Sequence, residues 1–253
     1  MLLENIDGLL WLLVLTVPLI YLQRSLHKEI QGVFLLLTRR ADIALVLFSL
    51  LFLPGVFLHE TSHYLMARLL GVKTGRFSLL PRPMDDGHLQ LGYVETARTD
   101  VIRDSLIGAA PLLAGGISVA LTGLWGLDLD TFWSLVVSGQ IESLGAAIKT
   151  VAAQPDFWLW LYLTFVISST MLPSASDRRA WRFVLLVSGI VLAVVLLAGA
   201  GPWLVAHLAP PLNSGLRAVA VVFGISVSVH ALILLVVYLL RKLLSKLLKL
   251  QVV

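Results

Sequence analysis

Long apolar runs separated by short polar segments dominate the chain. The apolar runs cover residues 9–22, 41–70, 101–124, 157–172, 181–200 and 219–240. Most of them approach or exceed the roughly 20 residues that a helix needs to cross the hydrocarbon core of a bilayer. The pattern therefore predicts an all-α polytopic membrane protein with about six transmembrane helices.

Three other segments mix apolar and charged residues at helical spacing. Residues 26–40 predict an amphipathic helix at the membrane interface, and short amphipathic helices are expected on the outer surface within residues 127–155. The tail at 241–249 has lysines on one helical face and leucines on the other. It is expected to lie on an anionic bilayer surface, so the lipid bilayer is a predicted partner.

Residues 72–98 depart from the helical pattern. Two short runs with partial alternation of apolar and polar residues flank residues 81–87, which contain two prolines, two aspartates and a glycine. Such a dense turn signal between alternating runs predicts a β-hairpin. A surface loop is the alternative.

The composition supports the membrane class and excludes others. Hydrophobic residues make up 58% of the 253 residues and charged residues 13%, and the mean hydropathy is +0.92. The net charge of +4 comes without a long basic run, so we expect no nucleic-acid partner. The chain has no cysteine, which leaves histidine and carboxylate side chains to hold any zinc ion.

The apolar run 41–70 contains a group of chemically reactive residues. His59, Glu60 and His63 form an HExxH pattern. On a helix the two histidines share one face, close enough to hold one metal ion. Glu60 is turned about 100° from His59, so it can act as a general base without being a ligand. Polar residues are costly amid lipid-facing leucines, which favours a metal site over residues that merely pair within the helix.

A catalytic zinc site needs a third protein ligand. The candidates outside the motif are His88 in the predicted turn, Asp104, Asp177 and His230. Asp177 follows Pro173, which can end a helix and turn the carboxylate inward. Alternatively, Asp177 pairs with Arg178 or Arg179 at a helix end. Residue spacing leaves this choice open.

These features resemble the site-2 protease family of intramembrane zinc metalloproteases. Members carry HExxH on one span, a membrane-associated β-hairpin after it, a Gly-rich span, and an Asn-x-x-Pro…Asp-Gly stretch that ends another span. The chain matches the first motif at residues 59–63 and the hairpin at 72–98, and Thr170…Pro173…Asp177 resembles the last. It departs from the family where Thr170 replaces the asparagine and Arg178 the glycine. The resemblance covers about residues 41–180.

The resemblance implies an enzyme that hydrolyses peptide bonds in or near transmembrane segments of membrane proteins. It implies one zinc ion per chain, held by His59, His63 and Asp177, with Glu60 as general base and then acid. The implied substrate-binding residues are Thr170, Pro173, Leu89, Leu91 and Tyr93. An extended substrate segment would pair with the hairpin edge.

The alternative function is that of a catalytically inactive homologue that binds membrane proteins. A transporter or channel is disfavoured, because His230 is the one further ionisable residue expected within the spans. The implied organisation is an N-terminal span with an interfacial helix (1–40), a metalloprotease core (41–180), and two spans with a basic tail (181–253).

Basic residues predict the orientation of the spans. They are abundant in the segment 71–103, just after the fourth span and in the tail, so these three regions are expected to face the cytoplasm. The active site would then lie toward the cytoplasmic side, which we expect in a bacterial or archaeal plasma membrane. The basic residues of segment 24–40 do not fit this alternation, so the side of the N-terminus is left undecided.

Overall fold

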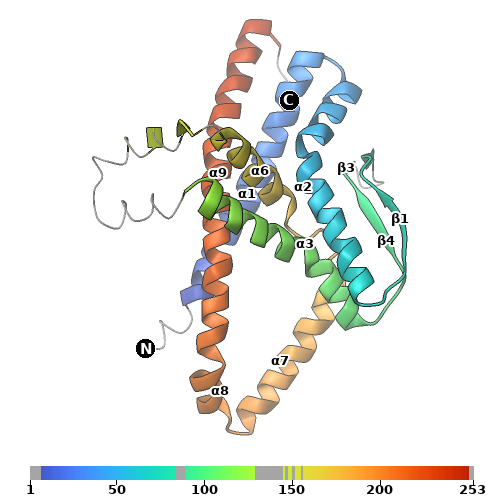
Figure 1. Ribbon diagram of the computed structural model, residues 1–253, viewed down its shortest axis with the longest axis vertical. Coiled ribbons are helices and arrows are strands. Elements are labelled where there is room, and N and C mark those ends of the chain that lie inside the picture. The colour runs from blue at the N-terminus through green and yellow to red at the C-terminus, as the bar shows by residue number, and fades with distance from the viewer. Residues whose placement is uncertain are drawn as a thin grey trace.

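Long apolar helices make up most of the computed structural model, which describes residues 7–83, 89–128, 156–250 and a few positions between 145 and 154. The helices are α1 (Asp7–Thr38), α2 (Ala41–Leu69), α3 (Val101–Leu121), α6 (Phe157–Thr170), α7 (Trp181–Leu197), α8 (Gly201–His207) and α9 (Ala209–Leu248) (Figure 1). A π-helical turn, η2 (Thr122–Gly126), extends α3.

Four of these helices are long and apolar enough to cross a membrane: α1, α2, α3 with η2, and α9. The helices α7 and α8 add a fifth if they form one span, which is bent by 115° near Gly199. The remaining apolar helix, α6, has 14 residues. The helical class and the membrane-spanning character of the chain are thus supported, whereas a total of about six spans stays a prediction.

The segments predicted as a span (9–22) and an interfacial helix (26–40) form the single helix α1. Residues 19–31 contain neither glycine nor proline, so nothing in this stretch interrupts the helical hydrogen bonds. The basic tail likewise continues α9 without a break as far as Leu248. The predicted amphipathic helices within residues 127–155 lie largely outside the described residues.

The helices α1 and α9 pack side by side in the same direction. The amide of Gly8 donates to Asn213 Oδ1 at 2.8 Å, and Arg241 Nε lies 2.8 Å from a Glu29 carboxylate oxygen further along both helices. Lys249 and the α1–α2 junction therefore lie at the same end of the molecule (Figure 1). The basic residues of segment 24–40, which the sequence left unplaced, thus accompany the basic tail.

The direction of α2 is opposite to that of α9. The two-residue link at 39–40 turns the chain back, and α2 runs from the basic end toward the β-hairpin (Figure 1). If both helices cross the bilayer, the hairpin and the tail lie on opposite sides. The basic residues instead predict that both face the cytoplasm, because four apolar runs, an even number, follow the hairpin before the tail. The side that each faces stays a prediction.

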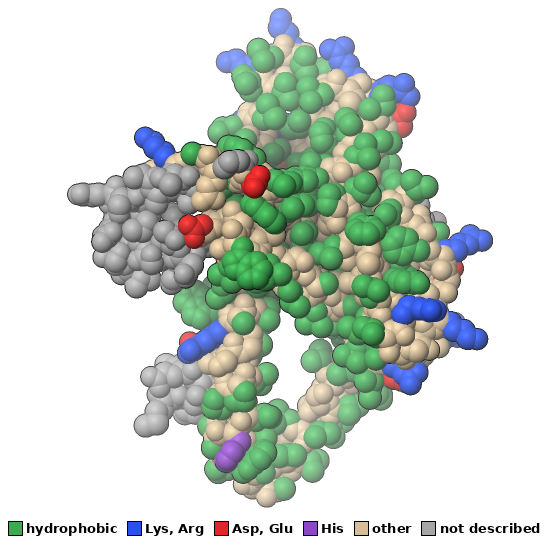
Figure 2. Space-filling model, in the orientation of Figure 1, with side chains coloured by type: hydrophobic (Ala, Val, Ile, Leu, Met, Phe, Trp, Pro, Cys, Tyr) green, Lys and Arg blue, Asp and Glu red, His purple; other side chains and the backbone are tan. Residues whose placement is uncertain are grey.

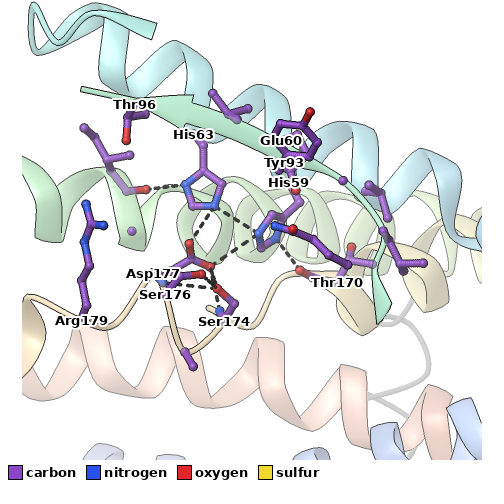
Figure 3. Close-up of a pocket in the computed structure, with 18 of the residues that line it drawn as sticks. His59, Glu60, His63, Tyr93, Thr96, Thr170, Ser174, Ser176, Asp177 and Arg179 are labelled. Atoms are coloured by element: carbon purple, nitrogen blue, oxygen red, sulfur yellow. Dashed lines mark hydrogen bonds and ion pairs between the residues drawn. The ribbon is translucent and has the colours of Figure 1, made fainter. Parts of the chain in front are cut away.

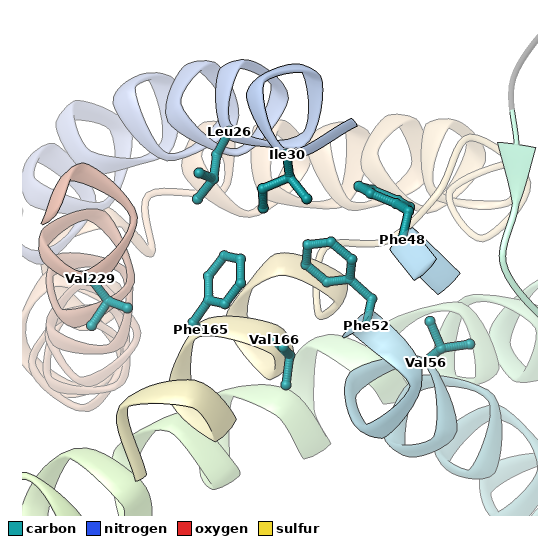
Figure 4. Packing of buried hydrophobic residues seen from close by; sticks show 8 residues of the cluster. All are labelled: Leu26, Ile30, Phe48, Phe52, Val56, Phe165, Val166 and Val229. Atoms are coloured by element: carbon teal, nitrogen blue, oxygen red, sulfur yellow. The ribbon is translucent and has the colours of Figure 1, made fainter. Parts of the chain in front are cut away.

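Hydrophobic side chains from α1, α2, α6 and α9 meet in one buried cluster (Figure 4). Its members are Leu26, Ile30, Phe48, Phe52, Val56, Phe165, Val166 and Val229. The outer surfaces are also apolar: α7 has no buried residue, and green side chains cover much of the face in Figure 2. Apolar surfaces of this extent suit contact with lipid.

The predicted β-hairpin is present beside α2. Strand β1 (Thr74–Ser78) pairs antiparallel with β4 (Tyr93–Thr96), and β2 (Arg82–Pro83) pairs with β3 (Leu89–Gln90). The tip at 84–88 lies outside the described residues. The Phe77 ring contacts Tyr64 of α2 edge-on, with 6.3 Å between ring centroids, and so holds the hairpin next to the HExxH helix.

Candidate metal centre

Two histidines of α2 and one aspartate of the α6–α7 loop converge (Figure 3). His59 Nε2 and His63 Nε2 are 3.2 Å apart, and the Asp177 carboxylate lies 3.8 Å from the first and 3.4 Å from the second. Ligand atoms about 2.0–2.1 Å from a tetrahedral zinc ion would be about 3.3 Å from one another. The spacing of the three side chains therefore fits a single metal ion, and each can supply one ligand atom.

The hydrogen bonds of both imidazoles fix which nitrogen is available. His59 Nδ1 lies 2.6 Å from the Thr170 carbonyl oxygen, and His63 Nδ1 lies 2.8 Å from the Ile107 carbonyl oxygen. A carbonyl oxygen only accepts, so each neutral imidazole carries its proton on Nδ1. The two Nε2 lone pairs then face each other and a carboxylate, an arrangement that a cation between them would stabilise.

The end of α6 supplies partners for two of these groups. The helix ends at Thr170, and Pro173 prevents its continuation, so the Thr170 carbonyl has no helical donor and accepts from His59. The amide of Ser174, which would otherwise bond to that carbonyl, donates to Asp177 Oδ2 at 2.7 Å. One break in the helix thus orients both a histidine and the carboxylate.

The Asp177 carboxylate is stabilised in its ionised form. Burial would raise the pKa of this carboxyl, but His59 and His63, whenever their imidazoles are protonated on Nε2, and the hydrogen bonds from Ser174 lower it well below its ordinary value. Neither neighbouring arginine takes Asp177 as its partner in the structure. Arg178 Nε donates to the Ser174 carbonyl, and Arg179 forms a two-point ion pair with Asp104.

The first part of α3 holds the Asp177 loop in place. Gly108 lies directly against the backbone of Asp177. One turn earlier, Asp104 accepts two hydrogen bonds from Arg179, at 2.6 and 2.8 Å. Between these two contacts lies the Ile107 carbonyl that binds His63. One short stretch of α3 therefore positions two of the three converging side chains.

The metal centre opens into a cavity of about 680 Å³. Glu60 lines it and is only 7% exposed. The hairpin forms one wall with Leu91, Tyr93 and neighbouring residues, and Thr170 lies on another. Pro173 ends α6 without lining the cavity. Leu89 lies in β3, where it pairs with Pro83 of β2.

The cavity also includes a residue that sequence analysis assigned to no site. His27 of α1 lines it, packed edge-on against Phe52 with 4.8 Å between ring centroids. The predicted metalloprotease core began at residue 41 and left α1 out. The signal in the sequence was an imidazole three and seven residues before Ile30 and Phe34, on the apolar face of the amphipathic segment.

The other candidate ligands lie elsewhere. His230 is fully buried between Ser169 Oγ, 2.9 Å from its Nε2, and the Ser226 carbonyl, 2.7 Å from its Nδ1. Asp104 lines the cavity but is paired with Arg179. His88 lies outside the described residues.

Comparisons with known proteins found no relative of this chain. The chain matches no protein-family model, and no curated protein or solved structure is detectably similar to it. The helices and the His-His-Asp group therefore carry the functional interpretation.

Proposed function

We propose that this protein is an intramembrane zinc metalloprotease of the site-2 protease type. The observation that carries the proposal is the convergence of His59 Nε2, His63 Nε2 and the Asp177 carboxylate on one point, with both Nδ1 atoms already bonded to carbonyl oxygens. Two neutral imidazoles and a carboxylate are the donor set of many hydrolytic zinc sites, which keep a fourth position open.

Each residue of the site has a distinct role in this proposal. His59, His63 and Asp177 would hold the zinc ion. When bound, zinc would polarise a substrate carbonyl and lower the pKa of water, so that water loses a proton more easily and attacks that carbonyl. Glu60 lines the same cavity next to the histidines and accepts the proton of the attacking water. It then delivers that proton to the departing amine.

The substrate class follows from the surroundings of the site. The HExxH segment lies in a helix long and apolar enough to cross a bilayer, so we propose that transmembrane segments are cleaved. A substrate helix must become extended before its backbone can be attacked. Strand β4 pairs with β1 on one side, and Tyr93, Val94 and Thr96 of β4 line the cavity. An unwound substrate segment would add to β4 as a further strand.

The remaining parts of the proposal rest on the apolar runs, the basic residues and the motif resemblance of the sequence. We propose about six spans, one zinc ion per chain, and an active site toward the cytoplasmic side of a bacterial or archaeal plasma membrane. A catalytically inactive homologue that binds membrane proteins is the alternative function. Glu60 favours the enzyme, because a structural metal site has no need of a buried carboxylate beside its ligands.

The test combines metal analysis with cleavage. Purified wild-type protein should contain about one zinc ion per chain, and it should cleave a transmembrane peptide reconstituted with it. His59→Ala and His63→Ala should lose the metal, whereas Glu60→Gln should keep the metal and lose cleavage. Equal metal content in wild type and His59→Ala would contradict the ligand assignment. Cleavage by Glu60→Gln at the wild-type rate would contradict the proposed catalytic role.

A further inference from the structure

The carbonyl group that orients His63 comes from the interior of a helix. Ile107 belongs to α3 (Val101–Leu121), and its oxygen accepts from His63 Nδ1 at 2.8 Å in a buried setting. In a regular α-helix that oxygen would accept from the amide of the residue four positions later. That residue is Pro111, which has no amide hydrogen.

We propose that Pro111 is a positioning residue for His63. Because it cannot donate, Pro111 leaves the Ile107 carbonyl without its helical partner and free to accept the Nδ1 proton of His63. This bond fixes the tautomer that presents Nε2 to the metal position. The inference rests on the proposed metal site and adds to it a residue outside the motif.

The second histidine is also oriented by a carbonyl that lacks its helical donor, although here the donor amide is diverted and not missing. The Thr170 carbonyl would accept from the amide of Ser174 if α6 continued. That amide instead donates to Asp177 at 2.7 Å, and the Thr170 oxygen accepts from His59. Both imidazoles are therefore held by carbonyls whose helical donors are missing or diverted. A buried carbonyl without any hydrogen-bond partner is costly. Each of these two carbonyls therefore gains a donor from its histidine, and each histidine gains an acceptor for its Nδ1 proton.

The competing interpretation is that Pro111 serves packing alone. Its side chain is fully buried, and Gly108 and Gly115 on the same helix contact Asp177 and Met171 closely. A packing role predicts that any comparable loss of fit in α3 harms the site. A positioning role predicts that restoring an amide at position 111 harms it, even though residues other than proline are far better helix formers.

The variant that separates these interpretations is Pro111→Val, which restores the amide and keeps the same number of side-chain carbon atoms. Pro18→Val makes the same chemical change inside α1. Val119→Ala removes volume from a fully buried position of α3, two turns after Pro111, and leaves every backbone amide in place. Each variant is made in the full-length chain and purified in detergent.

The first measurement uses metal-free protein. NMR of ¹⁵N-labelled histidine should show a hydrogen-bonded Nδ1 proton for His63, assigned by its absence from His63→Asn. In Pro111→Val this proton should be lost or should exchange much faster with water, while Pro18→Val and Val119→Ala should retain it. An unchanged signal in folded Pro111→Val would overturn the proposal.

The second measurement is zinc affinity by competition with a chelator. Partners of metal-bound histidines typically contribute about 10–100-fold to metal affinity, so Pro111→Val should weaken zinc binding by that factor and the two controls by less than about threefold. An equal loss in Val119→Ala would favour packing and overturn the positioning role. If the wild type binds no zinc, the proposed function fails, and the Nδ1 signal still decides the role of Pro111.

Discussion

Gly108 of α3 touches the backbone of Asp177, so that a Cβ atom at position 108 would overlap the Asp177 carbonyl oxygen. Glycine is therefore required here for a close approach and not for an unusual backbone angle. Since Asp177 is the loop residue that reaches the two histidines, the separation between α3 and this loop sets how far the carboxylate extends toward them.

We expect Gly108→Ala to push the loop outward and to weaken zinc binding by more than about tenfold, because outer contacts of ligands commonly contribute that much. The matched control is Gly116→Ala on the same helix, where the nearest atom to an added Cβ is a Val222 methyl at 4.0 Å. Isothermal titration of the metal-free proteins measures both. Equal zinc affinities of the two variants would contradict the supporting role of Gly108.

Replacement of Asp177 tests the third ligand. Asp177→Asn keeps the volume but removes the negative charge, and should reduce zinc affinity by more than about 100-fold, beyond the usual effect of outer partners. Asp104→Asn makes the same change at a carboxylate of the same cavity and should lose less than about tenfold in zinc affinity, because the asparagine oxygen still accepts a hydrogen bond from Arg179. Arg178→Gly should retain zinc, because Arg178 bonds to the Ser174 carbonyl and not to Asp177. Zinc binding and cleavage at wild-type levels in Asp177→Asn would exclude it as a ligand.

Zinc binding should depend on pH through two protons, one on each of the two histidine ligands. Imidazoles ligate only when neutral, and their ordinary pKa is about 6.5. The pKa of Asp177 is lowered, so its carboxylate stays ionised as the pH falls from 7 to 5. As the pH falls through that range, zinc binding should weaken, and the logarithm of the zinc dissociation constant should rise by nearly two for each pH unit. Competition titrations measure it, and a slope near three would show that Asp177 also takes up a proton.

Helix directions predict the sidedness of three positions. The parallel packing of α1 and α9 places Arg39 and Lys249 at one end, and α2 leads from there to Lys73 before the hairpin. Single cysteines can replace these residues, because the chain contains none. With a thiol reagent that does not cross membranes, Arg39→Cys and Lys249→Cys should react alike in intact cells, and Lys73→Cys oppositely. Identical labelling of all three would favour the charge pattern over the helix directions.

Properties that depend on local spacing could be read from the sequence. Apolar run lengths indicated helices able to cross a bilayer, and the turn-rich segment at 81–87 between alternating runs indicated the hairpin. His59 and His63 share a face of α2 because the helical period places residues four apart on one side. These features follow from backbone geometry within a few residues, so one sequence suffices to predict them.

Tertiary structure alone decided which distant groups meet these residues. The packing of α3 against the 171–177 segment depends on close contacts at Gly108 and Gly115. Between apolar helices, such contacts and not hydrophobicity select the partner, since lipid is as apolar as the helix surface. The same packing places Asp177 at the histidines, the Ile107 carbonyl at His63 and His27 of α1 in the cavity. The parallel course of α1 and α9 likewise follows from polar contacts between residues more than 200 positions apart.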